Sequence, residues 1–309
     1  MVNEAALQTR CCAPPALDMG EEKWIDVDGI HTRYFDQGEG ERLVFIHGVQ
    51  MGSTDGSSSA RTWDLNFAAL SSSFNTISLD RLGQGYTDNP KSDNDYTMHA
   101  SVQHVIAFLD RLGKKPYHLV GHSRGGYVVA RITMERPDLV KTITCVSSGT
   151  LAPGAPRTEA ATRNRPQPEH QRESIRWYLE RYSHNPMIVT DAWLDDSQRI
   201  SNLEKTQFAV SRMRASGLLK DQFAPKLYAQ RAETHQWLLT KGMACPTLIA
   251  WGRNDPGAHL EAGLRLIEMF MSLQPKTEWR LFNRCGHFVF REHPAAFNRM
   301  LHDFVRANC

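Results

Sequence analysis

The segment from Gly121 to Gly126 places a serine, Ser123, in the pattern Gly-x-Ser-x-Gly. An apolar, strand-like run (residues 117–120) precedes it, and a helix-like run (residues 127–131) follows it. In so sharp a turn the serine takes strained backbone angles and flanking side chains would collide, so glycine is needed on both sides. The hydroxyl would then stand clear near the positive end of the following helix. The pattern predicts a nucleophilic serine, although a glycine-rich turn without chemistry would look the same.

A serine hydroxyl is a weak nucleophile at neutral pH, so it needs a histidine base that a carboxylate holds in the right tautomer. Among thirteen histidines, only His287 combines a place after a strand-like segment (residues 277–282) with a preceding glycine. Asp255 follows another strand-like run (residues 245–252), and serine, acid, histidine is the chain order of doubly wound hydrolases. We therefore predict the triad Ser123, Asp255 and His287. A solvated loop histidine and a turn-capping aspartate are the plainer interpretation.

The oxyanion of such a reaction needs two backbone N–H donors. Arg124, directly after the nucleophile, supplies the first. The second is expected from Val49, in the loop that follows the apolar strand at residues 42–46. Gly48 lets this loop approach the substrate, and His47 is expected to brace it by hydrogen bonds rather than to react.

Four marks in this order resemble the α/β-hydrolase superfamily: His47-Gly48, the turn from Asp80 to Gly85, the segment from Gly121 to Gly126, and Asp255 with His287. The match runs from about Trp24 to Val305. The resemblance implies an α/β fold, with a mostly parallel eight-stranded sheet, flanking helices and a helical lid insertion. We expect Asp80 to hold loops rather than to serve as the catalytic acid.

Within the superfamily, Cys285-Gly286-His287-Phe288 followed by Glu292-His293 resembles the meta-cleavage-product hydrolases, which split carbon–carbon bonds in ring-opened aromatics. The chain departs from them at three places: they usually carry asparagine at His122, tryptophan at Phe288, and a Ser-Gly-Pro-Gly loop at residues 49–52. Their dienoate-binding lid arginine has no clear counterpart, since Ser197 falls near that place. Monoalkyl phthalate ester hydrolases are similar to the same branch.

These departures favour a carboxylic ester as the substrate, such as a monoester of an aromatic diacid, cleaved through an acyl-serine without a metal or organic cofactor. Carbon–carbon hydrolysis of meta-cleavage products is the alternative. Haloalkane dehalogenases and epoxide hydrolases are disfavoured because they carry aspartate where this chain has Ser123. A catalytically silent receptor of the same fold stays open as well, because such a receptor can keep the triad.

Strand signals disappear between residues 151 and 239, where Ser174 to Tyr182 has helical spacing. We predict a flexible N-terminal tail (residues 1–22), a core of residues 23–150 and 240–309, and a helical lid (residues 151–239). The residues expected to line the substrate pocket are Arg124, Trp177, Tyr178, Met187, Trp193 and Phe288. The arginine could pair with a substrate carboxylate, or form a salt bridge, or lie solvated at the surface. The others could instead pack the lid on the core.

Composition agrees with a small-molecule enzyme. The chain has 309 residues, 41% of them hydrophobic, and a net charge of +2. It can bury one large core, and it has no basic stripe for nucleic acid and no apolar run of about eighteen residues for a membrane span. The six cysteines show no metal-ligand spacing, and we expect reduced thiols in a cytoplasmic protein. The oligomeric state stays open, a homodimer included.

Overall fold

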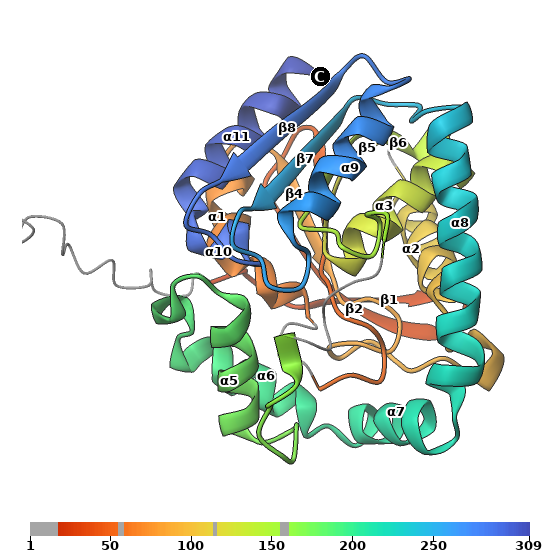
Figure 1. Ribbon diagram of the computed structural model, residues 1–309, viewed down its shortest axis with the longest axis vertical. Coiled ribbons are helices and arrows are strands. Elements are labelled where there is room, and N and C mark those ends of the chain that lie inside the picture. The colour runs from red at the N-terminus through yellow and green to blue at the C-terminus, as the bar shows by residue number, and fades with distance from the viewer. Residues whose placement is uncertain (1–17, 55–58, 114–115, 155–160) are drawn as a thin grey trace, which may run out of the picture.

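An eight-stranded sheet forms the centre of the molecule (Figure 1), with strands in the order β1-β2-β4-β3-β5-β6-β7-β8. The computed structural model describes residues 18–54, 59–113, 116–154 and 161–309. The strands are β1 (Lys23–Val27), β2 (Ile30–Gln37), β3 (Arg42–Ile46), β4 (Asn75–Leu79), β5 (Tyr117–His122), β6 (Val140–Val146), β7 (Thr247–Gly252) and β8 (Thr277–Phe282). Only β2 runs against its neighbours β1 and β4, and all other pairs are parallel. The predicted mostly parallel sheet is confirmed.

Helices cover both faces of the sheet (Figure 1). On one face α1 (Asp64–Ser71), α10 (Val289–Glu292) and α11 (Pro294–Ala307) pack together. On the other lie α2 (Met98–Leu112), α3 (Arg124–Glu135), α8 (Ala224–Thr240) and α9 (Leu260–Met271). The central strand β5 is buried along its whole length because it is covered from both sides.

Between β6 and β7 the chain leaves the sheet and forms α5 (Arg172–Tyr182), α6 (Asp191–Ser201) and α7 (Glu204–Ala215) before it returns through α8. The helix predicted at residues 174–182 is confirmed as part of α5. Short helical segments complete the chain: η2 (Ala60–Trp63), η3 (Asp93–Asp95), η4 (Pro137–Leu139), η5 (Pro186–Ile188) and the π-helical η6 (Leu219–Phe223). None of the described helices is long and apolar enough to cross a membrane.

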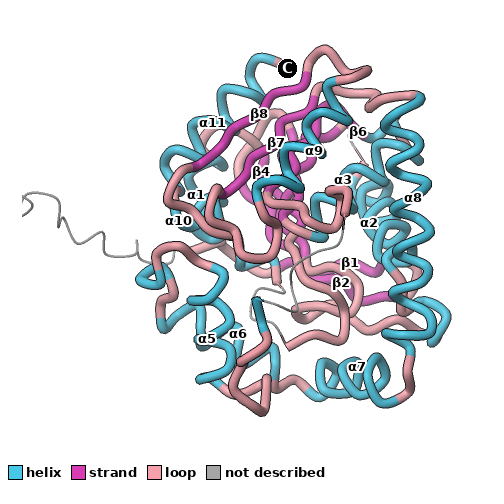
Figure 2. The backbone as a smooth tube through the Cα atoms, viewed as in Figure 1, coloured by secondary structure: helices cyan, strands magenta, loops and turns pink. Residues whose placement is uncertain are grey.

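The structure favours a shorter lid than the predicted residues 151–239. Figure 2 shows α5, α6 and α7 lying apart from the sheet, whereas α8 runs along the helical layer beside it. Leu227 and Leu238 of α8 are buried in the same cluster as the core helices, and α8 contacts α2 and α9. We therefore propose that the lid ends before α8 and that α8 belongs to the core.

The predicted tail, residues 1–22, is wrong for its last residues. Met19 is only 1% exposed and packs in a small cluster with Phe35 and Phe67. Glu22 forms an ion pair with the buried Arg33, at 3.0 Å. A lone apolar side chain in a polar stretch gave no periodic signal, although it anchors the entry to β1. Residues 1–17 of the predicted tail, with the adjacent Cys11 and Cys12, lie outside the described residues.

Candidate active site

Ser123 lies in the turn between β5 and α3 with φ +52° and ψ −116°. L-residues rarely adopt these angles, so close packing has to enforce them. A Cβ atom on Gly121 would lie 2.2 Å from the carbonyl oxygen of Gly125, and one on Gly125 would lie 2.2 Å from that of Ile46. Strand β5, helix α3 and strand β3 thus approach so closely that only glycine fits. The predicted strand-to-helix turn is confirmed, and the catalytic role of its serine is a proposal.

The backbone of Ser123 is held on both sides. Its N–H donates to the carbonyl oxygen of Val146 at 2.8 Å. Its own carbonyl accepts the N–H of Gly126 at 3.0 Å and the hydroxyl of Ser148 at 2.6 Å. Sequence reasoning missed Ser148, because a serine two residues past a strand carries no signal of its partner. These bonds keep the strained turn in place.

His287 and Asp255 meet as predicted, in a buried pair. Nδ1 of the histidine lies 2.5 Å from Oδ2 of the aspartate. Oδ1 of the aspartate accepts the N–H groups of Gly257 at 2.9 Å and Ala258 at 2.8 Å. His287 is 7% exposed and Asp255 is 4% exposed. A carboxylate with three donors around it fixes the orientation and tautomer of the imidazole, which leaves Nε2 for proton transfer.

His122 connects the histidine loop to the nucleophile turn. Its Nε2 donates to the carbonyl oxygen of His287 at 3.0 Å, and the centroids of the two rings lie 4.5 Å apart. Burial, and next the nearby His287, hold the pKa of His122 well below its usual range. The ring is therefore neutral at physiological pH. It donates to the loop of His287 from the position directly before Ser123.

The loop after β3 contacts Ser123, and the carbonyl groups of this loop point away from the serine. A Cβ on Gly48 would lie 3.0 Å from Cβ of Ser123. The Gly48 carbonyl accepts Nδ1–H of His47 at 3.0 Å and Nη2–H of Arg81 at 2.7 Å, and the Val49 carbonyl also accepts from Arg81. In a trans peptide the C=O and the next N–H point in opposite directions. The N–H of Val49 therefore points away from Arg81, which supports its proposed role as an oxyanion donor.

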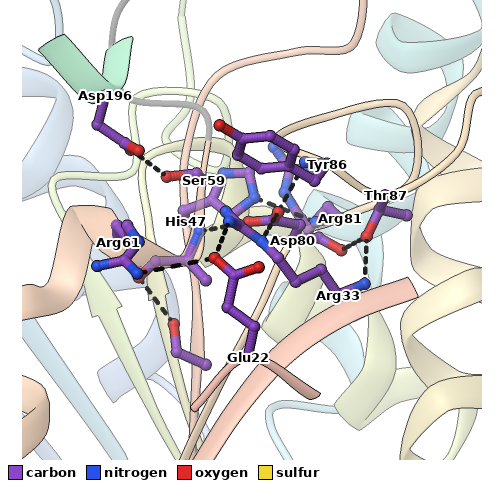
Figure 3. A network of polar contacts seen from close by, with 12 residues as sticks. Glu22, Arg33, His47, Ser59, Arg61, Asp80, Arg81, Tyr86, Thr87 and Asp196 are labelled. Atoms are coloured by element: carbon purple, nitrogen blue, oxygen red, sulfur yellow. Dashed lines mark hydrogen bonds and ion pairs between the residues drawn. The ribbon is translucent and has the colours of Figure 1, made fainter. Parts of the chain in front are cut away.

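Asp80 holds three segments together, as expected (Figure 3). Its Oδ1 accepts the N–H of Ala60 at 2.6 Å, and its Oδ2 accepts the N–H of Tyr86 at 2.8 Å and Nε–H of Arg33 at 2.7 Å. His47 lies beside this network and accepts the N–H of Arg81 through Nε2, at 3.1 Å. Burial lowers the pKa of His47 well below its usual range. His47 is thus a neutral brace with one donor and one acceptor in use.

Arg81 is a fully buried cation that sequence reasoning missed, because nothing in a turn sequence shows that its side chain points inward. Besides the two loop carbonyls, it donates to the hydroxyl of Ser101 at 3.2 Å. No ion pair joins it to a carboxylate within the described part of the chain. Burial, and then the charge of Arg124, lower its pKa to about 9. The base of this loop therefore carries positive charge with no anion of its own beside it.

The side chain of Arg124 lies between the loop after β3 and the lid. Its Nη2 donates to Oε1 of Gln50 at 2.7 Å. Its guanidinium carbon lies 5.4 Å from the ring centroid of Phe223, in η6. The residue is only partly exposed. This position is compatible with contact to a substrate carboxylate, which stays a proposal.

The aromatic residues predicted to line the pocket pack the lid on the core. Tyr178 stacks on Tyr182, with ring centroids 4.6 Å apart, and the ring of Trp193 meets that of Phe288 edge-on at 5.1 Å. Phe288 is fully buried, and Trp177 packs against the same cluster. Contact of these four residues with substrate stays a proposal.

Met187 does not lie on the inner face of the lid, where the sequence analysis placed it. It is 65% exposed, whereas the next residue, Ile188, is 4% exposed. The two follow Pro186 in the short 3₁₀ turn η5. A tight turn of this kind sends successive side chains in different directions, so only one of them faces the core.

Glu292 joins the end of lid helix α5 to the loop of the candidate base. Its Oε1 accepts the N–H of Gly286 at 2.7 Å, and its Oε2 accepts the N–H groups of residues 184 and 185 at 2.9 and 3.0 Å. The carbonyl of Tyr182 also accepts the N–H of His287, at 2.8 Å. Burial raises the pKa of Glu292 to about 7. Its place in the downstream motif is the one sequence signal that could have pointed to this role.

Known proteins with similar sequences are hydrolases. The sequence model of the alpha/beta hydrolase fold family matches residues 41–294. The 2-hydroxy-6-oxononadienedioate/2-hydroxy-6-oxononatrienedioate hydrolase of Paraburkholderia xenovorans is 26% identical, over 89% of this chain and 91% of the relative. The 2-hydroxymuconate semialdehyde hydrolase of Pseudomonas putida is 27% identical, over 90% of this chain and 91% of the relative.

A solved structure shares the architecture. The meta-cleavage product hydrolase CumD of Pseudomonas fluorescens IP01 matches with a TM-score of 0.77 and 25% identity, over 92% of this chain and 97% of that chain. The chain therefore belongs to the α/β-hydrolase fold family, in a branch that resembles the meta-cleavage-product hydrolases.

Proposed function

We propose that this hydrolase cleaves a carbon–carbon bond in a ring-opened aromatic acid of the 2-hydroxy-6-oxo-dienoate class. The observation that carries the proposal is a buried His287–Asp255 pair, linked through His122 to a serine turn, in a chain similar over about nine-tenths of its length to relatives named for such substrates. A few departures of the sequence from this branch favour an ester, whereas the relatives support the alternative, carbon–carbon cleavage, better.

In the proposed reaction His287 takes the proton of Ser123 while the serine oxygen adds to the substrate carbonyl carbon. The N–H groups of Arg124 and Val49 hold the oxyanion. The carbon–carbon bond then breaks, its electron pair stays on the departing carbon, and His287 returns the proton to that carbon. Water, activated by the same histidine, releases the second acid from the serine. One water is consumed, and there is no net oxidation or reduction.

Positive charge beside the site supports an anionic substrate. A departing carbon needs a conjugated oxo-acid to delocalise its electron pair, and such an acid carries a carboxylate. Arg81 lies under the loop without a carboxylate partner among the described residues, and Arg124 lies at its edge. The buried charge of Arg81 favours anions over neutral molecules at this end of the site. Arg124 is the side chain placed to pair with the carboxylate directly.

Hydrolysis of a carboxylic ester is the second candidate. The same residues would expel an alkoxide instead of a carbon, and a monoester of an aromatic diacid, such as a monoalkyl phthalate, would also present a carboxylate to Arg124. Two departures from the carbon–carbon hydrolases favour it. His122 stands where they usually carry asparagine, and Phe288 where they carry tryptophan.

A substrate panel separates the two candidates. Wild-type protein and Ser123→Ala are assayed with a 2-hydroxy-6-oxo-dienoate, a monoalkyl phthalate and a p-nitrophenyl ester. We expect wild type to show its highest kcat/KM on the dienoate, whose turnover is monitored through the loss of its visible absorbance. Ser123→Ala should turn over none of the three substrates. Turnover of the monoester without conversion of the dienoate would overturn the proposal.

Replacement of Arg124 tests how the substrate is recognised. Arg124→Met is expected to raise KM about 10- to 100-fold for the dienoate and the phthalate, because a charge-assisted pair is lost. The neutral p-nitrophenyl ester should be unaffected. Arg176→Met, on the exposed side of α5, is the matched control. An equal loss on the neutral ester would reject carboxylate pairing.

A further inference from the structure

Three residues far apart in the sequence meet at the end of the sheet opposite the lid. Glu41 directly precedes β3, His118 lies in β5, and Cys309 follows α11. One ligand atom from each lies within 4.8 Å of the others. Figure 1 shows the C-terminus at the top of the molecule and the lid helices at the bottom. We propose that Glu41, His118 and Cys309 bind zinc or a similar divalent transition metal ion.

The buried ring of His118 is the strongest part of the argument. Its Nδ1 lies 2.8 Å from the hydroxyl oxygen of Thr142, while its Nε2 has no hydrogen-bond partner and lies 3.5 Å from Oε2 of Glu41. In the tautomer that donates Nδ1–H to the Thr142 hydroxyl, the lone pair of Nε2 faces the Glu41 carboxylate. Two such atoms repel unless a cation lies between them.

The spacing of these atoms suits one ion. Zinc binds histidine nitrogen and carboxylate oxygen at about 2.0–2.2 Å in a tetrahedron, so two ligand atoms on the same ion lie about 3.3–3.6 Å apart. The 3.5 Å between His118 and Glu41 falls within this range. Thr142 would fix the ring in the way that outer hydrogen-bond partners fix metal-bound histidines. Cys309, exposed at the end of the chain, would complete the set with a thiolate.

Lys141 is the charged neighbour of this cluster. Its Nζ lies 3.1 Å from Oε1 of Glu41, and the hydrogen bond helps to hold the pKa of that carboxyl below its usual range. Glu41 therefore has one oxygen on the lysine and the other toward His118. Bound metal would ionise the Cys309 thiol and release a proton. The spacing of the six cysteines predicted no metal site, and it could not show this one, because its three residues stand at positions 41, 118 and 309.

Cobalt(II) is the probe, because a thiolate on cobalt gives a charge-transfer band in the near ultraviolet. Full-length reduced protein is titrated with cobalt(II) alone. We expect the band to saturate at one equivalent in wild type, to vanish in Cys309→Ser, and to need at least about tenfold more cobalt in Glu41→Gln. Both substituted residues are partly or fully exposed, so neither change should prevent folding.

Cys11 and Cys12 are neighbouring thiols that could also bind cobalt, so the double variant Cys11→Ser/Cys12→Ser is the control, and it should keep the band. A band that survives in Cys309→Ser, or that disappears in the double variant, would overturn the proposal. As a second readout, zinc should raise the melting temperature of wild type and not of Cys309→Ser. Hydrolysis should be the same in Cys309→Ser and wild type, so failure of this site and failure of the proposed function are distinguishable.

Discussion

Ser123 and Val49 both have positive φ, +52° and +65°, in two loops that touch. Each such residue costs about 1–3 kcal/mol, and a β-branched residue such as valine is especially rare there. The cost is sustained because several hydrogen bonds hold each backbone: Val146, Ser148 and Gly126 around the serine, and Arg81 at the valine. Strain of this kind orients the N–H groups proposed for the oxyanion before substrate arrives.

Arg81 is the side chain whose loss tests this orientation. Arg81→Met is expected to lower kcat about 10- to 100-fold with a smaller change in KM, because the Val49 N–H loses its direction while substrate contacts remain. Arg81→Lys should recover part of kcat, since an ammonium group reaches fewer carbonyls than a guanidinium. Steady-state kinetics measure kcat and KM of both variants, after circular dichroism has shown that each variant is folded like wild type. A raised KM with unchanged kcat would contradict the role.

At the scale of elements, the site depends on how closely β5 and α3 lie against β3. The contact leaves no room for a side chain at position 125, since the closest atom to a Cβ on Gly125 is a carbonyl oxygen of β3. Backbone cannot swing aside as a flexible side chain does. The position of the serine is therefore set by main-chain packing among three elements.

Gly125→Ala is expected to lower the free energy of unfolding by about 1–3 kcal/mol through overpacking. Gly149→Ala is the matched control: neither glycine has a left-handed φ, and a Cβ on Gly149 would lie 3.1 Å from a side-chain carbon of Ala258 rather than 2.2 Å from a carbonyl oxygen. Denaturant unfolding compares the two. A change in the free energy of unfolding of Gly125→Ala that lies within the scatter of wild-type measurements would contradict the close approach of α3 to β3.

The link from α5 to the His287 loop should depend on pH. The folded pKa of Glu292, about 7, lies above its ordinary value of 4.5, so the folded state binds a proton more tightly than the unfolded chain. The stability contributed by this group is complete below the lower value and is lost as pH rises through the higher one. Glu292→Gln cannot titrate. We expect the free energy of unfolding of wild type, relative to Glu292→Gln, to fall between about pH 5 and about pH 8.

Denaturant unfolding of both proteins across this range measures the difference. Glu180→Gln, on the lid and exposed, is the control and should show no such trend. A difference that stays constant or grows with pH would show that the carboxylate is ionised throughout.

Across the whole molecule, a feature could be predicted from the sequence when the residues that define it lie close together along the chain. The serine turn and the β8–His287 segment have local signatures, since glycine spacing and strand alternation are read within ten residues. The sequence did not show where Met19 and Met187 pack or which layer α8 joins, because each of these depends on the distant surface that the segment meets. Helical periodicity predicts that a segment is a helix, and it does not say whether the helix covers the sheet or the site.

Burial of thiols gives a prediction for the molecule as a whole. Cys145, Cys245 and Cys285 are buried, and burial raises the pKa of each thiol, to about 12 for Cys245. Because the thiolate is the reactive form, these three should resist a thiol reagent in the native state and react on unfolding. Cys309 should react at once. Mass spectrometry after timed labelling reads each site, and early labelling of Cys145 would contradict the described core.

The hydrogen bond from His287 to the Tyr182 carbonyl has a consequence for engineering. Chimaeras that import a foreign lid to change specificity also import the main-chain acceptor for His287, the proposed catalytic base. A crossover placed after Asn185 would inherit the native acceptor and the donors to Glu292 together. A crossover placed before α5 would replace them, and such a hybrid would lose turnover for reasons unrelated to its new pocket.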